Sequence, residues 1–159
     1  MPNIIFDLGG VVLEWNPETI LEGCYTDPHS RATMKAALFQ HTDWLRMDRG
    51  TLTEIEALAN LEQRTGRPKA ELAGLFEVIR NSLKPKDDTV ALIERLAQRQ
   101  IPLYCLSNMS GSTFAYVREK HAFWTAFRGI VSRALSLRTV LFEDARQCEA
   151  ELDRWLGAG

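Results

Sequence analysis

Polar side chains that can do chemistry follow three short apolar runs of this sequence. Asp7 follows the first run, Ser107 and Asn108 follow the second, and Glu143 and Asp144 follow the last. Carboxylates are nucleophiles and ligands of hard cations, while hydroxyl and amide groups donate hydrogen bonds to anions. In an open parallel sheet, ligands bind beyond the carboxyl ends of the strands. We therefore expect these groups to converge, although the sequence separates them widely.

Four apolar segments predict the strands that would position these groups. Their ranges are 3–6, 101–106, 129–132 and 140–142. Each is a short run bounded by polar or turn-forming residues, which is typical of a buried strand. Because helical patterns alternate with these strands, we expect an α/β domain with a parallel sheet.

Residues 16–85 contain no convincing strand pattern and predict an all-helical insertion of four helices. Asn16 is an N-cap candidate directly before Pro17. Thr51 with Glu54 is typical of a capping box at the start of a later helix. The insertion separates the first predicted strand from the second.

The composition is that of one globular domain with a full-sized core. The chain has 159 residues, of which 45% are hydrophobic and 25% charged, and a net charge of -2. It lacks the basic excess typical of nucleic-acid binders and the roughly 20-residue apolar run of a membrane span. No basic segment precedes the short apolar run at the N-terminus, as a secretion signal would require. We therefore expect a cytoplasmic protein with a small-molecule partner, and neither nucleic acid nor membrane.

The order and spacing of these segments resemble the haloacid dehalogenase-like (HAD) hydrolase superfamily, and most closely its phosphatase-type members. Residues 4–10 match the first motif, an apolar strand followed by an aspartate nucleophile in Asp-Leu-Gly. Residues 106–108 match the second motif, a strand ending in Ser-Asn. Residues 139–144 resemble the fourth motif, with Glu143 where the first of two acids is commonly Asp. Each motif is short, and the resemblance rests on their order across the whole chain.

The resemblance implies a Rossmann-like, HAD-like core formed by residues 1–15 and 86–159, with a four-helix cap at residues 16–85. It also implies a Mg²⁺-dependent phosphatase that acts on a small phosphorylated metabolite through an aspartyl-phosphate intermediate. A hard cation would reduce the repulsion between the attacking carboxylate and the phosphoryl oxygens. The implied site comprises the nucleophile and metal ligand Asp7, the further metal ligands Gly9, Glu143 and Asp144, and the substrate-binding residues Ser107, Asn108 and Gly10.

The sequence departs from the family pattern at two places. Gly9 stands where many family phosphatases have an aspartic general acid and base, so the leaving group would need to have a low pKa or take its proton elsewhere. The lysine of the third motif is missing, together with roughly 20 residues expected between Arg138 and Thr139. Seven residues, from Arg133 to Thr139, are left to join the third and fourth predicted strands. Fully extended, they reach about 23 Å, whereas the connection must span about 22 Å in a direct line. We therefore expect a shortened or rearranged C-terminal part of the core, and a homodimer if that segment swaps into a neighbouring chain.

Alternative interpretations remain open at this point. The missing lysine favours a catalytically impaired HAD-like binding protein, and a 2-haloacid dehalogenase is a further alternative that Gly9 does not favour. Ser107 and Asn108 would also suit the cap of the following helix. Trp15 follows the nucleophile loop, where it would either pack in a core or line the interface with the cap.

Overall fold

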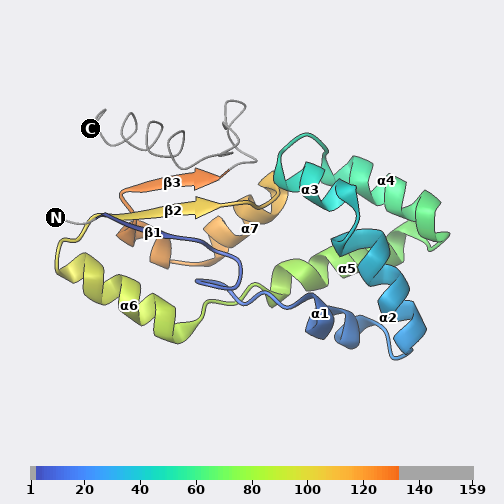
Figure 1. Ribbon diagram of the computed structural model, residues 1–159, viewed down its shortest axis with the longest axis horizontal. Coiled ribbons are helices and arrows are strands. Elements are labelled where there is room, and N and C mark those ends of the chain that lie inside the picture. Colours follow the sequence, from blue (N-terminus) through green and yellow to red (C-terminus); the bar gives the residue numbers. More distant parts are fainter. Residues whose placement is uncertain (1–2, 133–159) are drawn as a thin grey trace.

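The computed structural model describes residues 3–132, and within them three parallel strands form one sheet (Figure 1). The strands are β1 (Ile4–Phe6), β2 (Leu103–Ser107) and β3 (Gly129–Ser132), in the order β1-β2-β3. The β2 and β3 arrowheads point toward a separate group of helices. Because the strands are parallel, their carboxyl ends share the edge that faces those helices.

Two helices and a 3₁₀ helix accompany the sheet, and together with β1–β3 we call them the sheet region. They are α6 (Asp87–Gln98), α7 (Gly111–Lys120) and the 3₁₀ helix Phe123–Ala126. The register places Phe6 opposite Cys105, and both belong to one buried cluster that also includes side chains of both helices. This shared core fixes the positions of the strand ends relative to one another.

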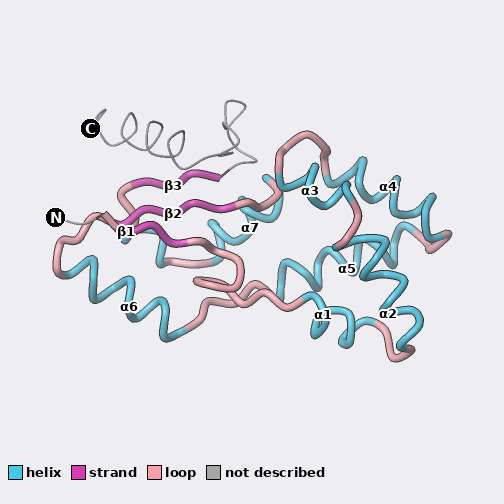
Figure 2. Tube along the Cα trace, in the orientation of Figure 1, coloured by secondary structure: helices cyan, strands magenta, loops and turns pink. Residues whose placement is uncertain are grey.

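A second group of helices lies beyond one end of the sheet (Figure 2), and we call it the helical region. Its apolar faces form a hydrophobic cluster distinct from that of the sheet region. The partly buried side chain of Trp15 packs against both clusters. The region comprises α1 (Pro17–Cys24), α2 (Pro28–Met34), the π-helix Lys35–Phe39, α3 (Thr42–Asp48), α4 (Glu54–Thr65) and α5 (Lys69–Ser82).

The helical region contains five α-helices, so the prediction of four is wrong by one. The chain turns at Gln40 and His41 and begins α3 immediately afterwards. The N-cap of α3 is His41, whose Nδ1 accepts a hydrogen bond of 3.1 Å from the backbone N–H of Asp43. Histidine is not among the preferred N-cap residues, so the sequence pattern did not reveal this break.

The capping box of α4 lies two residues later than predicted. It joins Thr53 and Glu56 rather than Thr51 and Glu54. The other predicted cap is confirmed, because the Asn16 side chain accepts hydrogen bonds from the first turn of α1. Both the predicted and the observed pairs have a Thr-x-x-Glu pattern, so spacing alone did not distinguish them.

The chain passes between the two regions twice, and the two crossings pair with each other. Leu13 and Pro85 form an antiparallel bridge. The Glu14 N–H donates to the Lys84 carbonyl at 2.8 Å, and the Lys86 N–H donates to the Val12 carbonyl at 2.9 Å. The helical region is therefore attached through a short two-stranded connection.

Several predictions fall outside the described residues. They are the strand at 140–142, the acids Glu143 and Asp144, and the shortened junction at Arg138 and Thr139. Within residues 3–132, no helix combines the length and the apolar character that crossing a membrane requires.

Candidate active site

Asp7 lies directly after β1, at the end of the strand that faces the helical region. Its side chain is exposed, and its Oδ1 accepts a hydrogen bond of 2.7 Å from the backbone N–H of Leu8. Phe6 and Leu8 are both buried, which anchors the backbone on either side. The carboxylate is therefore presented outward from a fixed backbone, as a nucleophile or cation ligand requires.

A tight turn follows Asp7. The Leu8 carbonyl accepts hydrogen bonds of 3.0 Å and 2.8 Å from the N–H groups of Val12 and Leu13. Gly10 has a φ of +78°, in the left-handed region that residues with a side chain rarely adopt. The predicted substrate-binding residue Gly10 thus forms the turn and is not among the residues that line the cavity described below.

The end of β2 brings Asn108 to the same edge of the sheet. Ser107 is buried, with 2% of its surface exposed, whereas the Asn108 side chain is exposed and lines the cavity with Asp7. The alternative that Ser107 or Asn108 caps the next helix is wrong. Ser110 caps α7: its Oγ accepts from the backbone N–H of Thr113 at 3.4 Å and lies 2.9 Å from the Thr113 hydroxyl. Asn108 is therefore left to face the cavity.

A cavity of about 180 Å³ lies where the strand ends of the sheet region meet the helical region. Asp7 and Asn108, which lie far apart in the sequence, both line it. The sheet region contributes mainly polar groups, and the helical region contributes mainly apolar ones. The lining residues are Asp7, Gly9, Asn108, Met109, Ser110 and Thr113 from the sheet side, Trp15 and Leu83 from the crossings, and Trp44, Met47, Asp48, Phe76 and Ile79 from the helical region.

Two tryptophans form the aromatic wall of this cavity. Trp15 and Trp44 stack with ring centroids 5.6 Å apart and an interplanar angle of 26°. Phe39 of the π-helix packs edge-on against both, with centroid distances of 5.7 Å to Trp15 and 4.9 Å to Trp44. This three-ring cluster holds the wall in one arrangement.

A buried carboxylate positions α3, the helix that carries Trp44. Asp43 is 6% exposed and accepts hydrogen bonds from Asn60 at 3.2 Å and Arg64 at 3.3 Å, both on α4. Burial alone would raise the pKa of Asp43, but these donors and the nearby positive charges hold it below its usual value. The charged carboxylate therefore ties α3 to α4.

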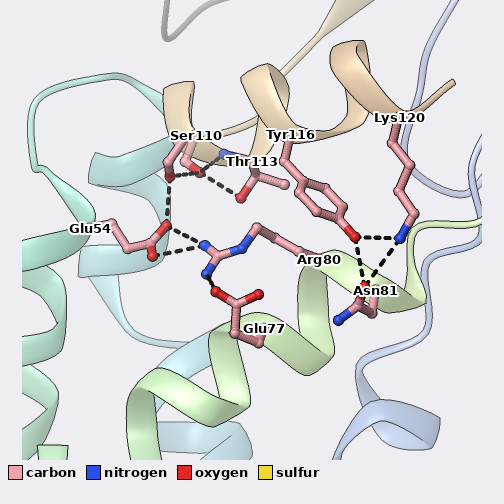
Figure 3. A network of polar contacts seen from close by, with 9 residues as sticks. Glu54, Glu77, Arg80, Asn81, Ser110, Thr113, Tyr116 and Lys120 are labelled. Atoms are coloured by element: carbon pink, nitrogen blue, oxygen red, sulfur yellow. Dashed lines mark hydrogen bonds and ion pairs between the residues drawn. The ribbon is translucent and has the colours of Figure 1, made fainter. Parts of the chain in front are cut away.

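Polar contacts also join the helical region to α7 (Figure 3). Arg80 of α5 pairs with Glu54 of α4 at 2.8 Å and 2.9 Å, and the hydroxyl of Ser112 donates to Glu54 at 2.6 Å. Further along α7, the Tyr116 hydroxyl donates to Asn81 of α5 at 2.6 Å. These contacts hold the helical region against the helix whose first turn lines the cavity.

The thiol next to this strand end is not a nucleophile at neutral pH. Burial raises the pKa of Cys105 to about 12, and the negative charge of Asp7 contributes in the same direction. Thiols react as thiolates, and this pKa keeps the thiol protonated. Cys105 is therefore not a competing nucleophile, and Asp7 stays the nucleophile that the sequence predicts.

Some cavity residues were not predicted from the sequence. Ser110 and Thr113 follow the second motif closely, and their Ser-x-x-Thr spacing was a usable signal for a helix cap beside the site. Trp44, Asp48 and Phe76 belong to helix faces whose orientation depends on tertiary packing, and no local pattern marks them. Trp15 lies at the junction of the two regions, where the interface interpretation placed it.

The site offers some of the oxygen ligands that Mg²⁺ binds. Asp7 and Gly9 line the cavity and offer carboxylate and carbonyl oxygens, the ligands that Mg²⁺ prefers. Within residues 3–132, no three acidic, histidine or cysteine side chains form a group able to hold a metal. The other predicted ligands, Glu143 and Asp144, lie outside that range. Of the predicted side-chain ligands, Asp7 is thus the one that lies within the described residues.

Comparison with known proteins gives a moderate sequence likeness. No protein-family model matches the chain. It is 27% identical over 131 residues to the sesquiterpene phosphatase astK of Aspergillus oryzae. This match covers 82% of the chain and 63% of that protein, so the chain spans less than two thirds of its relative.

Solved structures show the fold. The HAD family enzyme BT-2542 of Bacteroides thetaiotaomicron, in complex with magnesium and inorganic phosphate, superposes with a TM-score of 0.69 at 14% identity, covering 98% of this chain and 78% of that one. The chain has a HAD-like fold. The L-2-haloacid dehalogenase of Xanthobacter autotrophicus has a TM-score of 0.61 at 15% identity, covering 98% of this chain and 64% of that one. The HAD-like fold confirms the α/β class with a parallel sheet that the sequence predicts.

Proposed function

We propose that this chain is a HAD-like hydrolase of the phosphatase type, with Asp7 as its nucleophile and Mg²⁺ as its cofactor. One observation carries the proposal: Asp7 and Asn108, from the ends of two neighbouring strands, line one cavity. The relative astK is named a phosphatase, and the structural neighbour BT-2542 was solved with magnesium and inorganic phosphate. Both support phosphoryl chemistry at this edge of the sheet.

The reaction divides one displacement into two steps. A carboxylate oxygen of Asp7 forms a bond to phosphorus while the bond to the leaving oxygen breaks, and the leaving group keeps that electron pair. Water then attacks the aspartyl-phosphate, which releases inorganic phosphate and restores Asp7. Bound Mg²⁺ would neutralise negative charge on the phosphoryl oxygens.

Side chains from β2 and α7 complete the polar end of the cavity. The amide of Asn108 and the hydroxyls of Ser110 and Thr113 are the donors for the phosphoryl oxygens. The adjacent Ser107 is buried and is not among the residues that line the cavity. In the proposed reaction these donors stabilise the charge that develops as the phosphoryl group transfers.

Gly9 restricts the leaving group. An acid at this position would protonate the departing oxygen, and glycine has no side chain to do so. We therefore propose a small phosphorylated metabolite whose leaving group takes its proton from water rather than from residue 9. Within this scheme residues 16–85 act as the cap that selects the substrate, over a core of residues 1–15 and 86–159.

The proposal is tested by phosphate release from p-nitrophenyl phosphate and acetyl phosphate, with and without Mg²⁺. We expect Mg²⁺-dependent turnover that falls at least about 10³-fold in Asp7→Asn, with the melting temperature retained. Asp88→Asn, on the exposed first turn of α6, is the matched control and should retain full activity.

Other outcomes separate the alternatives. Absence of turnover with retained phosphate binding would identify a HAD-like binding protein and reject the phosphatase. Chloride release from 2-chloropropionate without metal would identify the dehalogenase, whose fold this chain shares. Equal activity of Asp7→Asn and wild type would remove Asp7 from the mechanism.

A further inference from the structure

The cavity has a polar end and an apolar end. Asp7, Asn108, Ser110 and Thr113 lie at the polar end, where the proposed function places the phosphoryl group. Any organic group attached to that phosphoryl group must extend toward the opposite walls. Those walls are mainly apolar. They comprise Trp15, Trp44, Met47, Phe76, Ile79 and Leu83, with Asp48 as the charged residue among them.

The two tryptophans are the part of this wall that a ligand can reach. Met47, Phe76 and Ile79 are buried, with 3%, 4% and 2% of their surfaces exposed, and serve mainly as packing behind the surface. Trp15 and Trp44 are only partly buried. Because they stack on each other and pack edge-on against Phe39, their rings are ordered before any ligand binds, which reduces the entropy lost on binding.

The apolar walls and the lack of basic lining residues disfavour a polyhydroxylated or a second anionic group. Among the described residues that line it, the charged side chains are Asp7 and Asp48, and none is Lys, Arg or His. The nearby Arg80 is paired with Glu54 and Glu77. A polyhydroxylated group would lose its hydrogen bonds to water against tryptophan and aliphatic walls. A second anionic group would find no basic side chain among these described lining residues.

We infer that the substrate carries a single phosphoryl head on a hydrocarbon with few or no hydroxyl groups, seated against Trp15 and Trp44. This inference rests on the proposed function and names the class of its substrate. Apolar groups gain by leaving water for such walls, roughly in proportion to the area they bury. The helical region thereby selects for hydrophobic phosphate esters and against sugar phosphates.

The wild-type protein is tested with ethyl, butyl, hexyl and octyl phosphate beside glycerol 3-phosphate and glucose 6-phosphate. We expect kcat/KM to rise about fourfold per added methylene until the apolar end is filled. The kcat/KM values for glucose 6-phosphate and glycerol 3-phosphate should be lower than the value for butyl phosphate. A flat dependence on chain length, or a preference for glucose 6-phosphate, would overturn the inference.

Variants then locate the selectivity. Trp44→Ala should lower kcat/KM for octyl phosphate about tenfold and leave ethyl phosphate nearly unchanged. Trp44→Phe, which keeps an aromatic ring, should recover most of the loss. Leu45→Ala is the matched control, because Leu45 is the neighbouring residue of α3, is 54% exposed and does not line the cavity.

Binding to Asp7→Asn separates this inference from the proposed function. Calorimetry with octyl phosphate and glycerol 3-phosphate measures binding affinity, and thus the contribution of the apolar end, without any chemical step. Tighter binding of octyl phosphate supports the inference even if no phosphate is released. Asp7-dependent turnover of acetyl phosphate with equal binding of the two ligands would reject the substrate class and retain the phosphatase.

Discussion

The sheet region and the helical region line the same cavity, the first mainly with polar and the second mainly with apolar side chains. From the sheet region come Asp7, Asn108, Ser110 and Thr113, whose positions follow from strand ends and a helix cap. From the helical region come mainly aromatic and aliphatic side chains, which extend that region's own hydrophobic cluster, together with Asp48. Because each region has its own core, the reacting groups and the selective wall are built independently.

This difference in lining indicates where substrate selectivity can change without loss of turnover. A substitution on the helical side should alter which phosphate ester binds, whereas a substitution at the strand ends should alter turnover of every substrate alike. The regions are joined by two paired crossings and by the contacts of Ser112 and Tyr116 on α7. The following predictions test this division.

Among the predictions that test this division, the largest effect is expected at Asn108. Asn108→Ala should lower kcat about 10²-fold for short and long alkyl phosphates equally, because it removes a donor for the phosphoryl oxygens. Steady-state kinetics with ethyl and octyl phosphate measure this, and Gln98→Ala at the exposed end of α6 is the control. A loss confined to octyl phosphate would break the division between the regions.

The next effect concerns the stability of the helical region. Asp43→Asn should lower the free energy of unfolding by about 1–3 kcal/mol at pH 7, since it leaves the guanidinium groups of Arg64 and Arg46 without their carboxylate. The KM for octyl phosphate should rise, because α3 carries Trp44. Urea unfolding and kinetics check both outcomes, with Asp88→Asn as the control.

The pH dependence of this effect has a fixed sign. The pKa of Asp43 is lowered in the folded protein, so its stabilisation is fully present above its unfolded pKa of about 3.9 and is lost as the pH falls through the folded value. The difference between wild type and Asp43→Asn should therefore shrink below about pH 4. A difference that grows on acidification would contradict the role assigned to Asp43.

A smaller effect, and a gain, is expected at Gly9. A Cβ added here would meet Trp15 Cγ at 4.0 Å, an ordinary contact, so the position leaves room for a Cβ. Gly9→Asp should raise kcat for phenyl phosphate about tenfold relative to p-nitrophenyl phosphate, because an acid can protonate the poorer leaving group. Gly9→Asn supplies similar volume without the acid. If the ratio of kcat for phenyl phosphate to kcat for p-nitrophenyl phosphate is equal in the two variants, proton transfer does not limit the reaction.

Much of the strand-end chemistry could be predicted from the sequence because it is local. An apolar run that ends in Asp7, and another that ends in Ser107 and Asn108, place their polar groups at one edge once the strands are parallel. That Ser107 binds substrate stays a prediction. Ser107 is buried and is not among the residues that line the cavity. Glu143 and Asp144 stay predictions outside the described residues.

The helical side could not be predicted because its lining depends on packing between helices. Trp44 reaches the cavity because His41 begins a new helix and Asp43 ties that helix to α4. Neither event has a strong local signature: histidine is an uncommon N-cap, and the Asp43 partners lie 17 and 21 residues away. Periodicity predicted the helices but not the direction in which each face points.

The most direct test of the central claim is to trap the phosphoenzyme. Wild-type protein is mixed with acetyl phosphate and Mg²⁺, quenched in acid, digested, and analysed by mass spectrometry for a phosphorylated aspartate. We predict phosphate on Asp7 in the peptide that contains Asp7-Leu8-Gly9, and none in Asp7→Asn. Phosphate on another residue, or turnover without phosphate on Asp7, would contradict the account.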